Sequence, residues 1–190
     1  MVDNRLNIMR IALRLFAHHG YDAVGVQQIV TEAGVTKPTL YHYFENKLGL
    51  FQAIVAHHTA ELLPTITQAA YYEHDIRYSI TKVVQAYFEY AQRQPNFYRL
   101  MLSTWFAPSS SEYAPIIAEL HHQQYLLLEQ LFLAAADDHG NMTGRHQRYA
   151  VSLRGMIDTY IGLAFQGKID LNDADLIYKI GHQYMHGIFS

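Results

Sequence analysis

The chain has 190 residues, of which 50% are hydrophobic and 16% are charged. This composition is apolar enough for a sizeable core and excludes an intrinsically disordered chain. No run approaches the roughly 18 uninterrupted apolar residues of a membrane span, and no apolar segment of signal-peptide length stands at the N-terminus. Because cysteine is absent, disulfides, thiolate metal sites and cysteine redox switches are excluded too. We therefore expect a cytoplasmic protein that does not associate with membranes.

The charge is distributed unevenly along the chain. The formal net charge is −3, which by itself argues mildly against a protein that binds nucleic acid. Residues 1–50, however, carry five basic and four acidic side chains, so the remainder of the chain carries the negative balance. Any charge that meets a phosphate must therefore be local. A local patch is sufficient, because such contacts act at short range and are screened beyond about 10 Å.

Helical periodicity dominates the N-terminal third. Apolar residues recur with the spacing of one helix face at Met9, Ala12, Leu13 and Phe16. Gly20 is predicted to end this helix as a left-handed C-cap. A short helix follows over 26–33 and stops at Gly34. Another begins after Thr36, which can cap it, with Pro38 in the first turn, where a missing N–H costs nothing.

The rest of the chain also reads as helices. Asn46 is predicted to cap a longer helix, which Pro64 kinks or ends. Further helices are predicted over 76–93, 95–106, 112–136, 146–166 and 173–188. No alternating strand pattern of useful length is present. The sequence therefore predicts an all-α fold of about nine helices.

The stretch most informative about function is 25–50. Gly34 permits the tight turn between two short helices, and inward-facing apolar residues fix their crossing angle. These inward residues are Ile29, Val35, Leu40 and Phe44. Left partly outward at the start of the second short helix are Lys37, Thr39, Tyr41, His42 and Tyr43. A helix-turn-helix reads DNA bases with these N-terminal positions, and the helix dipole there favours phosphate.

In this stretch the sequence resembles the TetR (tetracycline repressor)/AcrR-like family of bacterial transcriptional regulators. The matching residues are 16–17, 20–21, 29–30, 33–36, 39–47 and 50. The resemblance implies a homeodomain-like three-helix DNA-binding domain at 1–48 and a helical ligand-sensing and dimerisation domain at 49–190. It also implies a homodimeric repressor, released from a palindromic DNA operator by a small hydrophobic or aromatic effector.

The resemblance further implies which residues lie at or near double-stranded DNA. They are Arg5, Gln27, Thr36, Lys37, Pro38, Thr39, Tyr41, His42, Tyr43 and Lys47. Within this set Lys47 would meet a phosphate and Arg5 would act as an arm contact. The alternatives are that Tyr41 mainly packs, that His42 is a surface histidine, and that Lys47 is only a solvated charge. Gly25 stands where the family often has Ser or Thr, so one phosphate contact is missing. The arm and domain are also less basic than in many relatives, so affinity should be modest and depend strongly on salt.

Beyond residue 50 the chain is rich in aromatic residues on different predicted helices. A cavity between helices, lined by rings and a few hydroxyls, would suit a flat or apolar organic ligand. The candidate ligand-binding residues are Tyr87, Tyr90, Phe97, Trp105, Phe106, Tyr125, Met156 and Tyr160. The alternative for each of them is ordinary packing in the core.

The last two predicted helices look like a dimer interface. The final helix carries an apolar stripe, and the helix before it is apolar on more than one face, which indicates burial on two sides. The candidate interface residues are Gly155, Ile161, Ile177, Ile180, Gly181, Tyr184 and Ile188. A dimer would place two reading helices about 34–36 Å apart, on successive major grooves. The alternative is burial within one large subunit.

Three alternatives remain beside this function: a metal site, an enzyme and a module that binds other proteins. His182 and His186 have a spacing that can hold a metal, but surface or interface histidines are the preferred interpretation, and we predict no metal and no cofactor. No phosphate loop, nucleophile elbow or cysteine nucleophile is present, so we predict that the protein is not an enzyme. A module that uses its helix-turn-helix for protein contacts is the third alternative.

Overall fold

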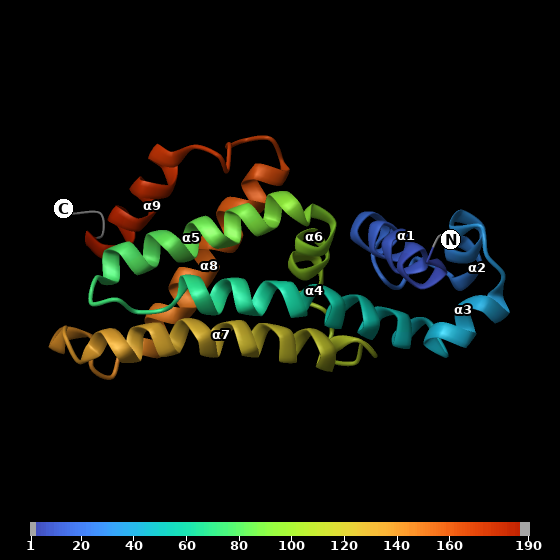
Figure 1. Cartoon of the computed structure of the whole chain (residues 1–190), viewed down its shortest axis with the longest axis horizontal. Helices are drawn as coiled ribbons and strands as arrows, with labels where there is room; N and C mark the ends of the chain where they lie inside the picture. Colours follow the sequence, from blue (N-terminus) through green and yellow to red (C-terminus); the bar gives the residue numbers. More distant parts are fainter. Residues whose placement is uncertain (1–2, 187–190) are drawn as a thin grey trace. The chain divides into compact units, whose positions relative to one another are not determined.

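The computed structural model describes residues 3–186, except for the side chain of residue 141, and over this range it contains nine α-helices, one 3-10 turn and no strand (Figure 1). The prediction of an all-α fold of about nine helices is confirmed. The helices are α1 (Asn4–His19), α2 (Val26–Ala33), α3 (Lys37–Phe44), α4 (Lys47–Ala69), α5 (Ile76–Arg93), α6 (Pro95–Thr104), α7 (Ala114–Ala136), α8 (His146–Phe165) and α9 (Ala174–His186), with the 3-10 turn η1 (Gly140–Met142) between α7 and α8.

Side chains and glycines set the helix ends of the N-terminal third. Asp3 caps α1, since its carboxylate accepts from the backbone N–H of Arg5 at 2.9 Å. Gly34 ends α2 in the left-handed region, with φ 67° and ψ 32°. Gly20 also has a positive φ of 82°, but its ψ of 152° lies outside the left-handed helical region. The prediction of a left-handed cap at Gly20 is therefore wrong, although the helix does end there.

Pro64 neither ends nor breaks α4, which runs on to Ala69. A proline inside a helix loses one backbone hydrogen bond and costs about 3 kcal/mol or more. Leu62 and Ile66 lie on either side of it and are both fully buried. Burying each of these side chains contributes about 1.5–3 kcal/mol, which offsets the cost of the proline. The predicted end of the helix at this position is therefore wrong.

The remaining helices differ from the prediction only at their ends. Helix α6 ends at Thr104, so the predicted residues 105–106 lie beyond it, and α7 begins at Ala114 rather than at residue 112. Ile188, which was predicted for the dimer interface, lies outside the described residues. No helix within residues 3–186 is long and apolar enough to cross a membrane.

The chain packs as two compact units. The first comprises the chain up to Ala60 together with Gln94–Leu120, and the second comprises Glu61–Arg93 and the chain from His121 onward. In the first unit α6 packs against α1, so the N-terminal three helices share a core with a later segment. In the second unit α5 packs against both α8 and α9. The predicted boundary after residue 48 divides a DNA-binding from a ligand-sensing part of the chain and does not coincide with a division between the packing units. It stays a prediction.

Candidate nucleic-acid interface

Helices α2 and α3 are held rigidly on α1. Ile29 and Leu40 are fully buried, and only 4% of Phe44 is exposed. The Asn7 side-chain amide donates to the Ala33 carbonyl oxygen at 2.9 Å and so ties α1 to the end of α2. The inner face of α3 is therefore fixed by packing, and the side chains on its outer face project from a helix that is held in place.

The turn between α2 and α3 is also well defined. The Val35 N–H donates to the Val30 carbonyl at 3.0 Å, next to left-handed Gly34. The Thr36 hydroxyl accepts from the Thr39 N–H at 3.4 Å and lies 2.9 Å from the Thr39 hydroxyl. Thr36 is thus the N-cap of α3, as predicted, and the exposed start of this helix carries the positive end of its dipole.

The outer face of α3 is exposed and rich in aromatic rings. Tyr41 is 44% exposed and Tyr43 is 39% exposed. The rings of His42 and Tyr43 lie 5.3 Å apart. Lys37 is exposed at the start of the helix and makes no hydrogen bond or ion pair with any described residue. An exposed lysine beside aromatic rings at a helix start suits contact with a DNA groove.

All ten residues predicted to lie near DNA belong to the first unit. Eight are exposed and two are half-buried: the exposed ones are Arg5, Gln27, Thr36, Lys37, Pro38, Tyr41, His42 and Tyr43, and the half-buried ones are Thr39 and Lys47. The Arg5 guanidinium lies 5.5 Å from the centre of the Phe44 ring, and the Gln27 amide donates to the Thr31 hydroxyl at 3.3 Å. Arg5 is therefore brought close to α3, and Gln27 lies on α2.

Lys47 holds a loop of its own unit. Its ammonium donates to the backbone carbonyls of Tyr21 at 3.1 Å and Val24 at 3.3 Å, and it lies 4.0 Å from the centre of the Tyr21 ring. These two carbonyls belong to the segment that enters α2. Lys47 is therefore more than a solvated charge: it positions the helix-turn-helix from the start of α4. The predicted phosphate contact of Lys47 stays a prediction.

Tyr21 is the centre of a cluster that sequence reasoning missed. Its hydroxyl donates to the Glu112 carboxylate at 2.5 Å, and its ring packs on Phe16, Phe51 and Tyr113. Burial, and then the bond to Glu112, raise the pKa of the Tyr21 hydroxyl well above its usual value. The spacing along the chain gave no signal for the Glu112 partner, which comes from the segment before α7.

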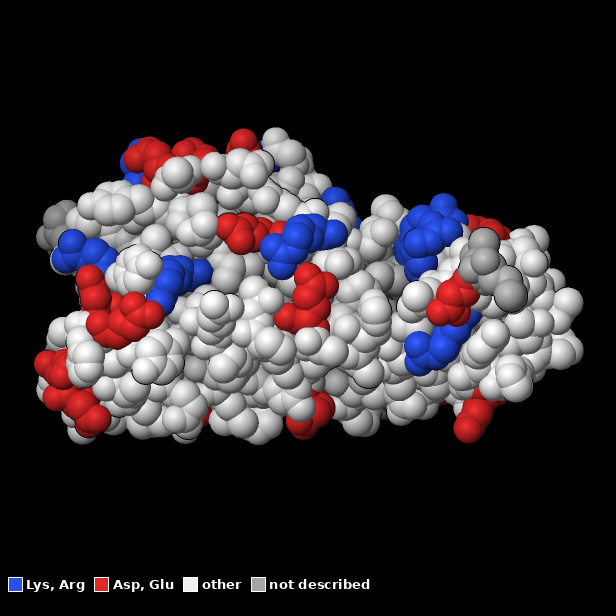
Figure 2. Space-filling model, in the orientation of Figure 1, with Lys and Arg blue, Asp and Glu red and all other residues white. Residues whose placement is uncertain are grey.

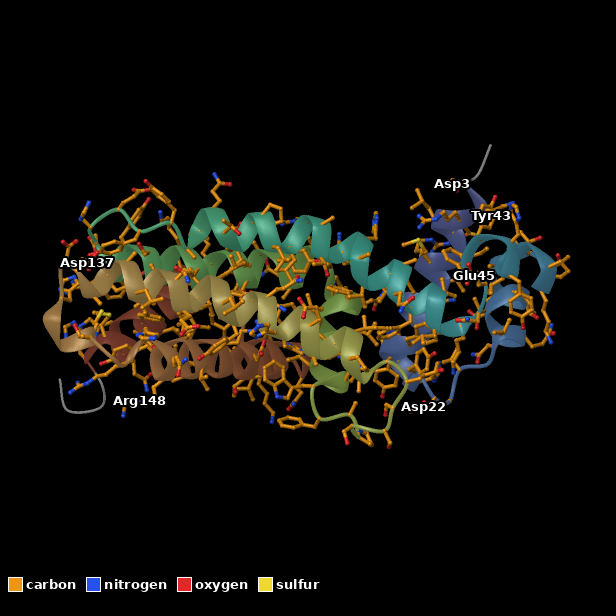
Figure 3. The ribbon with its side chains drawn as sticks, turned by 90° about the horizontal axis from the view of Figure 1, so that it is seen from below. Asp3, Asp22, Tyr43, Glu45, Asp137 and Arg148 are labelled. Carbon is orange, nitrogen blue, oxygen red and sulfur yellow. The ribbon has the colours of Figure 1, made fainter. Side chains whose placement is uncertain are left out.

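Gly49 was also missed, and it controls the turn from α3 into α4. The Asn46 side-chain oxygen accepts from the Gly49 N–H at 2.7 Å, which confirms Asn46 as a cap. A Cβ atom at Gly49 would collide with the Phe44 carbonyl oxygen. Glu45, with a positive φ of 64°, completes this tight turn, and Tyr43 and Glu45 are labelled there in Figure 3.

The basic side chains around the interface are partly neutralised. Arg14 pairs with Glu32, and Arg10 donates to the Asn7 side chain at 3.0 Å. On the face drawn in Figure 2, Lys and Arg over the N-terminal helices alternate with Asp and Glu and form no continuous basic surface. Lys37, which has no partner among the described residues, is the strongest candidate for a phosphate or base contact.

The residues predicted to line a ligand cavity are not brought into one unit. Phe97, Trp105 and Phe106 belong to the first unit, and the other five belong to the second: Tyr87, Tyr90, Tyr125, Met156 and Tyr160. Phe106 is 90% exposed and Trp105 is 42% exposed, because both lie beyond the end of α6. This exposure argues against a place for these two in a cavity between helices, and their role in ligand binding stays a prediction. Tyr87, Tyr90 and Phe97 are fully buried, and the remaining three are half-buried.

The second unit buries a polar group that the sequence did not reveal. Arg154 on α8 is 4% exposed, pairs with Asp158 at 3.0 Å, and stacks over the Tyr87 ring, 4.6 Å from its centre. Burial raises the pKa of the Tyr87 hydroxyl to about 12. The predicted ligand residue Tyr87 therefore meets a buried ion pair, which is a specific polar feature within an apolar unit.

The predicted interface residues fall into two groups. Ile161, Ile180 and Gly181 are buried within their own subunit, which favours burial in a single chain for these three. Gly155 is exposed, and Ile177 and Tyr184 are half-buried. The Tyr184 hydroxyl donates to the Tyr149 carbonyl at 2.6 Å and ties α9 to α8.

The two histidines of α9 lie next to each other on one side of the helix. The ring centres of His182 and His186 lie 4.5 Å apart. No group of three or more histidine, aspartate or glutamate side chains with metal-binding geometry occurs in the part of the chain that the structure describes. The prediction that the protein holds no metal stays a prediction.

Comparison with known proteins places residues 8–54 in a family model described as bacterial regulatory proteins, tetR family. The HTH-type transcriptional activator FasR of Mycolicibacterium smegmatis is 32% identical over 99 residues, which cover 52% of this chain and 45% of that protein. The FadR regulator of Bacillus subtilis, solved in complex with stearoyl-CoA, has the same fold, with a TM-score of 0.80 at 18% identity over 96% of this chain and 98% of that one. The fatty acid degradation regulator FadR of Bacillus halodurans gives a TM-score of 0.77 at 19% identity, covering 100% and 98% of the two chains. The matches to curated relatives such as FasR span less than half of those proteins' length.

Proposed function

We propose that this chain is a transcriptional repressor of the TetR family of bacterial regulatory proteins, which binds a palindromic operator as a homodimer and releases it when a small molecule binds. One observation carries the proposal. The outer face of α3 exposes Lys37, Tyr41, His42 and Tyr43, while its inner face is locked by fully buried Leu40. A rigid helix with an accessible polar and aromatic face suits insertion into a major groove.

In this proposal each part of α3 has its own role. Lys37 stands at the helix start, where its ammonium and the helix dipole both attract a phosphate or the acceptor edge of a guanine. The aromatic rings of Tyr41 and Tyr43 contact sugars or thymine methyl groups, and their hydroxyls can bond phosphate. Few unpaired cations surround them, so the electrostatic part of the affinity should be modest, since each phosphate contact adds to it by releasing counterions.

A homodimer gives this contact its specificity. Helix α8 exposes Val151, Gly155 and Thr159 one above another, with 58% of Val151 accessible. A face of small residues lets a second helix approach closely, and a twofold axis through it would pair the same face of two copies. Two α3 helices then read two half-sites of a palindrome.

Release by an effector requires a ligand site whose occupancy changes the preferred separation of the two α3 helices. Helix α4 follows α3 directly and is the natural route for such a change. The stearoyl-CoA bound to FadR of Bacillus subtilis carries a long apolar acyl chain beside its charged coenzyme A part, which supports an effector with a hydrophobic portion. Fully buried Tyr87 and Tyr90 are the strongest candidates among the predicted ligand residues.

The test is a mobility shift on DNA fragments selected from genomic DNA by the purified protein. Lys37→Ala and Tyr41→Ala should each weaken binding by about tenfold or more, the usual cost of a lost phosphate or base contact. Lys168→Ala is the matched control, because Lys168 is an exposed lysine of the second unit. Circular dichroism should show that all three variants stay folded. Wild-type binding by both α3 variants would contradict the proposal.

A further inference from the structure

A pocket of about 330 Å³ lies between α5 and the segment that leads into α9, entirely within the second unit. Its apolar part is formed by Phe88, Leu171 and Ile177. Phe88 and Leu171 are almost fully buried, so they form a fixed floor. Its volume is within the range of small-molecule sites. None of the residues predicted to bind a ligand lines this pocket.

Close packing of the two helices defines one end of the pocket. A Cβ atom at Gly181 of α9 would lie 3.0 Å from the Thr81 hydroxyl of α5, so the helices touch there. Thr81 also lines the pocket, which therefore opens beside this contact. At the other side Asn172 is held by Asp170, whose carboxylate accepts from both its backbone and side-chain N–H groups at 2.9 Å. Direct contacts thus define both sides of the pocket.

The pocket carries one negative charge with no opposite charge beside it. Among the described residues that line it, Glu89 is the charged one, and its carboxylate accepts from the Gln85 side chain at 2.7 Å. No lysine or arginine within residues 3–186 pairs with Glu89. The nearest candidates in sequence are engaged elsewhere: Lys82 with Glu73, Arg93 with Glu61, and Lys179 with Asp175. An exposed carboxylate beside an apolar floor favours a cationic occupant.

We propose that this pocket binds an organic cation: a protonated amine attached to an aromatic or aliphatic body. The ammonium donates to Glu89, the body packs on Phe88 and Ile177, and the exposed ring of Tyr178 can lie against the cation. The occupant touches both α5 and α9 and so stabilises their packing. This site goes beyond the proposed function, because DNA binding by α3 does not depend on it.

Calorimetric titration of the full chain with three probes of one shape tests the proposal. Benzylammonium, benzyl alcohol and benzoate differ chiefly in charge. Benzylammonium should bind at least about tenfold more tightly than the other two, as expected for a charge-assisted contact. Glu89→Gln keeps the shape and removes the charge, and it should reduce the affinity for benzylammonium to that for benzyl alcohol. Asp137→Asn is the matched control, since this exposed acid at the end of α7 (Figure 3) does not line the pocket.

A second variant keeps the test independent of charge. Ala174→Phe places a ring at an exposed lining position and should abolish binding of benzylammonium while leaving the fold intact. Equal affinity for the three probes, no binding of benzylammonium at millimolar concentration, or unchanged binding by Glu89→Gln would each overturn the proposal. Mobility shifts without any probe separate this result from the proposed function, because Glu89→Gln should bind DNA like the wild type.

Discussion

The helix-turn-helix and the second unit use polar side chains in opposite ways. In α1–α3 none of the buried side chains is charged, and the groups proposed to meet DNA stand on the surface. The second unit instead buries Arg154 against Asp158 and also buries Gln124 completely. The first region is recognisable because a helix-turn-helix has a characteristic turn, helix length and exposed face. The polar side chains that distinguish the second region are buried in its core, and their spacing in the sequence does not predict this burial.

Breaking the buried ion pair should give the largest effect on stability. Asp158→Ala leaves the Arg154 guanidinium in the core without its carboxylate, which typically costs about 3–5 kcal/mol of unfolding free energy. The side chains of Arg154 and Asp158 are 5% and 14% exposed, so solvent screens little of this interaction. Chemical denaturation followed by circular dichroism measures the loss.

The exposed pair on α9 is the control for this prediction. Lys179 and Asp175 are 70% and 65% exposed, and exposed pairs contribute little to stability. Asp175→Ala should therefore leave the denaturation midpoint unchanged. If Asp158→Ala had no more effect than Asp175→Ala, the contrast between the two regions would be wrong. The double variant Arg154→Met/Asp158→Leu should recover most of the stability, because it leaves no buried charge.

Two lysines of the first unit separate positioning from DNA contact. Lys47→Met removes the donors to the Tyr21 and Val24 carbonyls and should cost about 1–3 kcal/mol, the usual cost of unsatisfied, partly buried groups. Lys37→Met removes an exposed side chain without a partner among the described residues, so stability should change by less than about 0.5 kcal/mol. Both variants should bind DNA more weakly, Lys37→Met at unchanged stability. Equal denaturation midpoints for the two variants would refute the positioning role of Lys47.

The sequence-based predictions succeeded where the interactions join residues close in the sequence, and failed where they join residues far apart. Gly34, Thr36 and Asn46 were placed correctly at helix ends, because a cap acts on backbone groups within a few residues. Of the two outcomes predicted at Pro64, the end of the helix was wrong, since the rule considers only the local chain and both neighbouring side chains, Leu62 and Ile66, are fully buried. The outcome there depended on tertiary packing, which the local pattern does not contain.

The candidate site divides in the same way. Exposure of Lys37, Tyr41 and Tyr43 followed from the period of a short amphipathic helix. The Glu112 partner of Tyr21 and the burial of Arg154 did not, because each depends on a residue brought close only by the complete fold. Aromatic content likewise does not separate a ligand cavity from a core, since large rings pack in both, and the ligand-binding residues stay a prediction.

A substitution with a small predicted effect on stability is also the sharpest test of how the first region meets DNA. Gly25 precedes α2 without a side-chain cap, and its φ of −88° and ψ of 153° suit any L-residue. Its Cβ position is open, with no atom within 4 Å. Gly25→Ser should therefore add a cap and raise the unfolding free energy by only a few tenths of a kcal/mol. In addition, the new hydroxyl can bond a phosphate, so operator affinity should rise in a mobility shift. Gly25→Ala adds the β-carbon without the hydroxyl and should gain neither stability nor affinity. If the serine and alanine variants bound DNA equally, the start of α2 would not lie against the phosphate backbone, and only α3 would remain as the contact surface.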